Sequence, residues 1–545
     1  HVTQKLQHGG SSVNQICGSH FFAKKTSFHV NFSQTKDRLK NLRRLGQPED
    51  LIEKVKMHFS IPDTAECSDE GGAYTAFNIH VNGVAHCSVR YSQLHHFNEQ
   101  MKKEFGQANL PPFPPKKLAL FTLTPQQIEE RREQLERYIQ IVSQDPEIIG
   151  SDVFNSFLNQ AQQETQKAEP ESVELDVFLM NGHKISVSIM STDQTDDVLE
   201  TVASQIELSD DFVYYFALFL VKKEKDGGNS IVRKLQEFES PYISLKTAES
   251  EAKHRIVLRK NFWEPSMDND LLDDRIAMNL LYVQAVNDIE RGWVFAAKDV
   301  HKQLAALQAK GSKKEYLKLA RTQKSYGFIQ FKPCVTDFPQ PNCPVIVSAG
   351  NRELNFRIKV ANNQVKEGIF KVTRMRCWRI TTQIPETNGA NAHGDSKDLK
   401  PKLEVAFEYL VAKDKLQWIT IESDQAILIS MCLQGMVDEL IMKKQGGRIK
   451  RPQDRVKRSQ SRQFLRKDGK TALPKSISAP GHLGTPDTNG DENVSAAQRA
   501  KDSVRRISDK FSSVTLKSTS RNTRGPAALV ENDVFEDSYI GDDDL

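Results

Sequence analysis

The stretch AYTAFNIHVNGVAHCSVRYSQL, residues 73–94, contains a tight-turn signal, two alternating segments and the start of a helix. Apolar and polar residues alternate on both sides of Asn82-Gly83, a dipeptide typical of β-hairpin turns. Beyond Ser92, apolar residues recur at helical spacing at Leu94, Phe97, Met101 and Phe105. The stretch therefore predicts a two-stranded hairpin that leads directly into a helix.

A second helix is predicted after the proline-rich residues 110–117. Thr124 is suited to cap it, Pro125 to open its first turn, and Gln127 to complete a capping box. Its apolar stripe consists of Ile128, Leu135, Ile139 and Val142. A helical pattern also runs through residues 151–166. We expect residues 57–166 to form one α+β domain, and residues 1–56, which lack periodicity, to be a disordered or non-native extension.

Three cations lie at the ends of the predicted elements of this domain. Arg90 ends the second hairpin strand, Lys116 follows the prolines, and Arg131 lies among the apolar residues of the second helix. A buried guanidinium needs an anionic partner, either an internal carboxylate or a phosphate-bearing ligand. Residues 111–116 also fit a polyproline ligand for another protein. A structural ion pair, a partner-binding segment and a phosphate site are thus three alternatives.

Three segments of this domain resemble the basic signatures of a PX (Phox-homology) domain: Arg90-Tyr91-Ser92, Pro-Pro-Lys-Lys at 114–117 and Arg-Arg-Glu-Gln-Leu-Glu at 131–136. The resemblance implies recognition of phosphatidylinositol 3-phosphate. Arg90 would bind the 3-phosphate, Tyr91 would pack on the inositol ring and Ser92 would add a hydrogen bond. Lys116 would reach the 1-phosphate, and Arg131 the ring hydroxyls.

The rest of the chain predicts three further units. Residues 173–266 begin with a hairpin around Asn181-Gly182 and a helix, as ubiquitin-like folds do. Residues 267–327 carry amphipathic helical patterns. Residues 328–445 show six successive strand patterns, closed by a long helix at 425–445, which is the layout of a PTB/PH-like domain.

Ubiquitin-like, helical and PTB/PH-like lobes in this order resemble a FERM domain, and a PX domain joined to a FERM-like module is similar to the PX-FERM sorting nexins. The fold class is therefore α+β multidomain. The resemblance implies an endosomal cargo adaptor that recognises NPxY or NxxY signals in receptor tails (lipoprotein receptor family, integrin-like, selectin-like) and recycles them to the plasma membrane. A FERM-type cortical scaffold that links membrane and cytoskeleton is the alternative.

A cargo groove would lie between an edge strand and the last helix, where a peptide adds as a further strand. Trp378 lies in the predicted edge strand, and Val437 and Ile441 are one helical turn apart on the helix. These three residues are the candidate cargo-binding residues. The alternative is that all three belong to the hydrophobic core.

Residues 446–545 predict a disordered tail. Between 448 and 470 there are ten Lys and Arg and two Asp, in a polar background. The acidic end, NDVFEDSYIGDDDL, would by the same resemblance engage the Retriever part of the Commander assembly through Ile540, Gly541 and Leu545. A free C-terminal leucine also suits a PDZ ligand.

Composition excludes several functional classes. The net charge of +4 over 545 residues implies no nucleic-acid partner, and no apolar run is long enough to span a bilayer. Seven cysteines without paired zinc spacing predict a reduced chain without a metal site. No catalytic or cofactor-binding motif is present. We expect a cytoplasmic, monomeric protein without cofactor, peripheral on early endosomes and not an enzyme.

Overall fold

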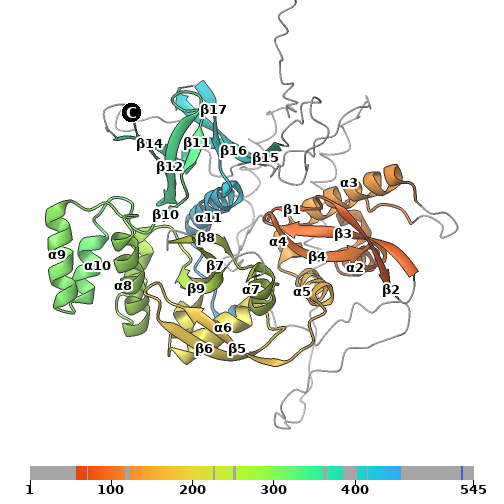
Figure 1. Ribbon diagram of the computed structural model, residues 1–545, viewed down its shortest axis with the longest axis horizontal. Coiled ribbons are helices and arrows are strands. Elements are labelled where there is room, and N and C mark those ends of the chain that lie inside the picture. Colours follow the sequence, from red (N-terminus) through yellow and green to blue (C-terminus); the bar gives the residue numbers. More distant parts are fainter. Residues whose placement is uncertain are drawn as a thin grey trace, which may run out of the picture. The chain divides into compact units, whose positions relative to one another are not determined.

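The computed structural model describes residues 57–69, 72–116, 123–224, 228–249, 253–359, 365–383, 402–413, 415–455 and 529–531 (Figure 1). All of them belong to one compact unit, Leu51–Leu545. They form an N-terminal domain (57–166), a first lobe (172–263), a second lobe (264–324) and a third lobe (327–444). The predicted extension at residues 1–56 lies outside the described residues, as does nearly all of the predicted tail beyond residue 455.

The N-terminal domain packs helices against a four-stranded antiparallel sheet, in which β3 pairs with β1, β2 and β4. Its elements are β1 (Phe59–Ser60), β2 (Thr64–Asp69), β3 (Gly72–Val81), β4 (Val84–Arg90), α2 (Tyr91–Phe105), α3 (Pro125–Val142), α4 (Pro146–Ile149) and α5 (Asp152–Gln166). Asn82 and Gly83 have φ of +52° and +77°, as a tight hairpin turn requires. Thr124 caps α3 with its side chain, as predicted. The α+β prediction is confirmed.

The β3–β4 hairpin contains a bulge that changes its register. A regular hairpin around Asn82-Gly83 pairs Val81 with Val84 and would continue to place Arg90 opposite Thr75. A register shift between Ile79 and His80 instead places Arg90 opposite Ala76. Because side chains alternate along a strand, this shift by one residue decides which face of the sheet Arg90 shares with β3.

The first lobe has a five-stranded sheet in the order β6-β5-β9-β7-β8, in which β5 and β9 are parallel. Its elements are β5 (Ser172–Phe178), β6 (Lys184–Met190), α6 (Thr195–Gln205), β7 (Phe216–Lys223), β8 (Asn229–Lys234), α7 (Pro241–Glu249) and β9 (His254–Lys260). The predicted hairpin and helix are thus present at the start of the lobe. β7 is buried along most of its length, since α6 packs on it and it lies between two strands.

The second lobe is helical, as predicted. Its helices are α8 (Arg275–Glu290), α9 (Lys298–Ala309) and α10 (Lys313–Ala320). Asp274 caps α8 by accepting hydrogen bonds from the backbone N–H groups of Ile276 and Ala277. α10 packs against both other helices and buries Tyr316 and Leu317.

The third lobe is a strand-rich unit closed by one long helix. Its elements are β10 (Ile329–Gln330), β11 (Cys334–Thr336), β12 (Cys343–Gly350), β13 (Glu353–Lys359), β14 (Val365–Lys371), β15 (Met375–Gln383), β16 (Lys402–Ala412), β17 (Lys415–Glu422) and α11 (Ala426–Lys444). The described strands follow the order β14-β13-β12-β11-β17-β16-β15, and a segment of the tail, β18 (Leu529–Glu531), adds beyond β15. α11 packs on β12, β15 and β16 and fills the core.

The N-terminal domain and the first lobe share buried contacts. Phe238, which precedes α7 in the first lobe, is only 1% exposed and packs into the core of the N-terminal domain. Asn159 donates a hydrogen bond to the carbonyl oxygen of Phe238 (3.0 Å), and the backbone N–H of Ser240 donates to Oε1 of Gln162 (2.8 Å). The buried Phe238 ring and these hydrogen bonds therefore hold the N-terminal domain and the first lobe together.

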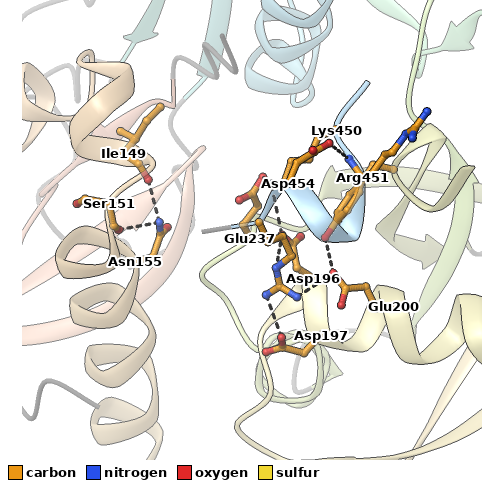
Figure 2. A network of polar contacts seen from close by, with 12 residues as sticks. Ile149, Ser151, Asn155, Asp196, Asp197, Glu200, Glu237, Lys450, Arg451 and Asp454 are labelled. Atoms are coloured by element: carbon orange, nitrogen blue, oxygen red, sulfur yellow. Dashed lines mark hydrogen bonds and ion pairs between the residues drawn. The ribbon is translucent and has the colours of Figure 1, made fainter. Parts of the chain in front are cut away.

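The chain after α11 packs back onto the first lobe. Figure 2 shows this segment, with Lys450, Arg451 and Asp454 labelled, beside α6 and its acidic residues Asp196, Asp197 and Glu200. Lys450 pairs with Glu237, and Arg451 pairs with Asp211 (both 3.1 Å). Arg455 bridges three carboxylates: Nη2 to Asp197 (2.9 Å), Nη1 to Glu200 (2.8 Å) and Nε to Asp196 (3.7 Å). We call residues 448–455 the ionic strap. Arg448 pairs with Asp454 (2.6 Å), so four of the ten cations between residues 448 and 470 have partners in the described part of the chain.

Candidate functional site

The first group of candidate residues lies where β4 ends and α2 begins. Arg90 ends the strand, and its backbone N–H donates to Oε1 of Gln93 (2.8 Å), which fixes the entry into the helix. Tyr91 and Ser92 are the first two residues of α2. The unpaired backbone N–H groups of a helix N-terminus attract anions, and the first turn of α2 has no acidic residue.

Tyr91 connects this helix end with the proline-rich segment. Its hydroxyl donates a hydrogen bond to the carbonyl oxygen of Pro114 (2.7 Å), and burial raises the pKa of the phenol. Phe113 packs edge to face on Tyr138, with ring centroids 4.9 Å apart. The proline run is thus built into the domain, which argues against its use as a ligand for a partner. Lys116 follows it and is exposed.

Arg131 reaches the same place from α3. Its guanidinium carbon lies 4.2 Å from the centroid of the Tyr91 ring, and Nη2 lies 3.4 Å from the carbonyl oxygen of Pro115. Partial desolvation lowers its pKa. Within the described part of the chain, Arg131 has no carboxylate at ion-pair distance. The structural ion pair that the sequence left open for Arg131 is therefore not formed there.

The neighbouring Arg132 makes the internal ion pairs instead. It contacts Glu129 at 2.6 Å and Glu136 at 3.2 Å, and it also donates to the carbonyl oxygen of Ile61. Arg131 and Arg132 are adjacent in sequence but differ in function, since one stabilises the fold and the other presents its charge over an aromatic ring. Cations, an aromatic face and a helix N-terminus together suit a phosphate on a polar ring.

The second group of candidate residues lies in the third lobe. Trp378 of β15 is fully buried, and its indole N–H donates to the hydroxyl of Ser430 on α11 (3.0 Å). Val437 is 1% exposed, and Ile441 is a partly buried residue at the margin of the same core. The structure thus brings all three to the layer between β15 and α11. A role for them in peptide binding stays a prediction.

The edge of β15 is paired with the chain's own tail. β18 lies antiparallel to β15, with Trp378 opposite Val530, Cys377 opposite Glu531 and Arg379 opposite Leu529. The prediction of a disordered tail is therefore wrong at residues 529–531. Three residues of moderate hydrophobicity are too short a signal to identify this strand. Ile540, Gly541 and Leu545 lie outside the described residues.

The opposite side of α11 is held by the linker between the first and second lobes. The carboxylate of Glu439 accepts hydrogen bonds from the backbone N–H groups of Trp263 and Glu264 (both 2.7 Å). Lys443, one turn further along α11, pairs with the side chain of Glu264. α11 therefore contacts the β15 strand on one side and a fixed linker on the other.

Comparison with known proteins gives this architecture a family. Family models match at residues 77–161 (PX domain), 173–263 (sorting nexin 17/27/31 FERM domain, F1 lobe), 264–324 (sorting nexin 17/31 FERM domain, F2 lobe) and 327–441 (sorting nexin 17 FERM C-terminal domain). Sorting nexin-17 of Danio rerio is 51% identical over 495 residues, 90% of this chain and 100% of that protein. The chain belongs to the PX-FERM sorting nexin family.

Other relatives are consistent with this family. Human sorting nexin-17 is 48% identical over 491 residues, 90% of this chain and all of the relative. Human sorting nexin-31 is 39% identical over 393 residues, 71% of this chain and 87% of the relative. As a PX-FERM sorting nexin, the protein is an endosomal sorting nexin of a family of adaptors, not of enzymes. No helix in the described ranges is both long and apolar enough to cross a membrane.

Proposed function

We propose that the chain is a cargo adaptor that binds phosphatidylinositol 3-phosphate through its PX domain and NPxY or NxxY sorting signals through its third lobe. It directs receptors from endosomes to the plasma membrane and away from lysosomal degradation. Ile540, Gly541 and Leu545 of the tail would connect it to the Retriever part of Commander.

The pairing of β15 with β18 is the main support for peptide binding. An extended segment already adds to the β15 edge beside α11, through the backbone geometry that β-augmentation uses. Trp378, Val437 and Ile441 would then form the apolar floor beneath a bound peptide. Ile441 is the residue of this group that retains exposure and can contact a ligand directly.

The sequence beyond β18 adds a second argument. Glu531 is followed by Asn532-Asp533-Val534-Phe535, which has the Asn-x-x-aromatic spacing of the proposed cargo signals. A segment that pairs with β15 and continues into such a motif indicates the type of ligand that the edge accepts. We infer that receptor tails use the same edge.

The environment of Arg131 supports lipid binding. Its charge has no carboxylate partner in the described part of the chain, and it lies beside Tyr91 and the N-terminal end of α2. A guanidinium placed in this way favours a phosphorylated ligand, because arginine forms paired hydrogen bonds with phosphate or with adjacent hydroxyls.

Binding of the full-length chain to a labelled NPxY peptide and to its Ala-substituted control tests the peptide site. Ile441→Asp should abolish binding, since it places a charge against the peptide without removing a buried side chain. Trp378→Ala is unsuitable, because truncating a buried tryptophan costs about 3–5 kcal/mol and can unfold the lobe. If neither wild-type nor tail-truncated protein binds the peptide, a cortical scaffold replaces the adaptor.

A further inference from the structure

The guanidinium of Arg90 is stacked on an aromatic ring that none of the family signatures includes. Its central carbon lies 3.4 Å from the centroid of the Tyr74 ring. Tyr74 is on β3 and half-buried, two residues before Ala76. The bulge between Ile79 and His80 places Ala76 directly opposite Arg90.

This register explains the stack. Residues two apart on a strand share a face, so Tyr74 is the diagonal neighbour of Arg90 on the adjacent strand. The directly opposite residue, Ala76, is small and leaves room for the arginine side chain to extend along β3 towards the ring. With the regular register, Arg90 would lie opposite Thr75, and Tyr74 would be on the other face of the sheet.

The stack covers only the face of the guanidinium. A guanidinium stacks through its flat face, whereas its five N–H groups point outward in its plane. The Tyr74 ring therefore occupies the face of the group without using the edge that a phosphate would contact. The ring also restricts a long side chain that would otherwise lose conformational freedom when the ligand binds.

We propose that Tyr74 is a positioning residue for phosphate recognition, holding the guanidinium of Arg90 so that its N–H edge faces a phosphate group on an inositol ring. This inference rests on the proposed lipid-binding function. It adds a residue that determines affinity for the phosphate without touching it.

A half-exposed tyrosine could instead insert into the membrane, so the experiment uses two probes. One is vesicles with and without phosphatidylinositol 3-phosphate, and the other is the soluble headgroup inositol 1,3-bisphosphate. The full-length variants are Tyr74→Leu, which keeps bulk but removes the aromatic ring, Tyr74→Phe as the matched control, Arg90→Gln, and the Tyr74→Leu/Arg90→Gln double variant. Thermal unfolding of each variant verifies its fold.

We expect Tyr74→Leu to lose about three- to tenfold in affinity for both probes, as the removal of a cation–π contact predicts. Tyr74→Phe should stay within about twofold of wild type, because the aromatic face is retained. Adding Tyr74→Leu to Arg90→Gln should cause no further loss, since the tyrosine acts only through the arginine.

Three results would overturn the inference while leaving the proposed function intact. Tyr74→Leu could bind like wild type although Arg90→Gln does not. It could lose affinity for vesicles but not for the soluble headgroup, which would make it a membrane contact. It could also weaken Arg90→Gln further, which would show an effect on the fold. Wild-type protein that binds neither probe contradicts the proposed function itself, and the inference with it.

Discussion

Phe238 and His86 meet edge to face, with ring centroids 5.2 Å apart and ring planes at 84°. His86 belongs to β4 of the PX domain, whereas Phe238 belongs to the first lobe of the FERM-like module. Both are buried, and Phe238 also packs near Phe59. The PX domain and the FERM-like module are therefore joined by shared core packing.

Phe238→Ala should destabilise this junction. Truncation of a buried phenylalanine costs about 3–5 kcal/mol, because it removes apolar contacts and leaves a cavity. We expect a lower midpoint of thermal unfolding and a PX domain that unfolds separately from the FERM-like module. Phe295→Ala is the matched control, since Phe295 is 46% exposed and its loss should cost under about 1 kcal/mol. Equal effects of both changes would contradict the shared core.

His86 predicts a pH dependence of stability. Burial lowers its pKa from 6.5 to about 4, and Nε2 lies 3.0 Å from the carbonyl oxygen of Leu158. The unfolded chain therefore takes up a proton below pH 6.5 that the folded chain excludes. Stability should be unaffected above pH 6.5 and fall between pH 6.5 and 4, by up to about 3 kcal/mol from this group. In denaturant unfolding, the free energy of unfolding of His86→Gln should decrease less between pH 6.5 and 4 than that of the wild type. An equal decrease in both proteins would exclude His86 as its source.

Arg131 and Arg132 should separate lipid binding from stability. Arg131→Ala should weaken binding to vesicles containing phosphatidylinositol 3-phosphate at least tenfold and leave the unfolding midpoint nearly unchanged, since no carboxylate loses its partner. Arg132→Ala should retain lipid binding but lose about 1–3 kcal/mol, because Glu136 is left without its cation. Vesicle sedimentation and thermal unfolding of both variants test this contrast. The opposite pattern would exchange the roles that we assign to the two arginines.

The tail strand predicts competition at the β15 edge. A chain that ends after Arg455 keeps the ionic strap but lacks β18, so it should bind an NPxY peptide more tightly than the full-length chain. Replacing Leu529–Glu531 by Gly-Ser-Gly should reproduce part of the gain, since the backbone loses its preference for an extended conformation. Fluorescence anisotropy with the three proteins measures the effect. Identical affinities would mean that β18 does not obstruct the peptide site.

The ionic strap should be sensitive to salt. Arg455 pairs with three carboxylates in a partly exposed network, which we expect to contribute about 1–2 kcal/mol and to weaken as ionic strength rises. Hydrogen exchange at residues 448–455 should be faster in Arg455→Ala at low salt and similar to wild type at high salt. Lys302→Ala is the control, because its pair with Asp299 is almost fully exposed. Exchange that does not respond to Arg455→Ala would show that the ion pairs of Lys450 and Arg451, with the partly buried Ile449, hold the strap without Arg455.

Local signals predicted much of the fold. The Asn82-Gly83 turn, the capping box at Thr124 and the apolar stripes of α2 and α3 are each encoded within a few neighbouring residues, and the structure contains all of them. Changes in hydrophobic periodicity likewise predict the order of the three lobes: a sheet-based lobe, a helical lobe, and a strand-rich lobe closed by a helix.

What could not be predicted depends on tertiary geometry. The bulge, in which His86 of β4 is the extra residue opposite the Ile79–His80 step, has no strong sequence signature, so the partner of Arg90 could not be derived from the turn. Both Arg131 and Arg132 lie near the boundary of the apolar stripe of α3, and only the position of Glu136 and Ile61 decides which one is paired. Phe238 lies outside the PX domain in sequence, so no pattern within that domain predicts that its ring completes the hydrophobic core of the PX domain.

The hydrogen bonds between Glu439 and the linker that joins the first and second lobes affect how sequence variants of this protein should be interpreted. Because this carboxylate holds the backbone of Trp263 and Glu264, a substitution or a one-residue deletion in that linker would displace α11, the helix beside the proposed peptide site, from 175 residues away. Under the proposed function, such an allele would change cargo binding while Trp378, Val437 and Ile441 remained unaltered. Variants in the linker should therefore be classified with those of the peptide site, and not with neutral changes between lobes.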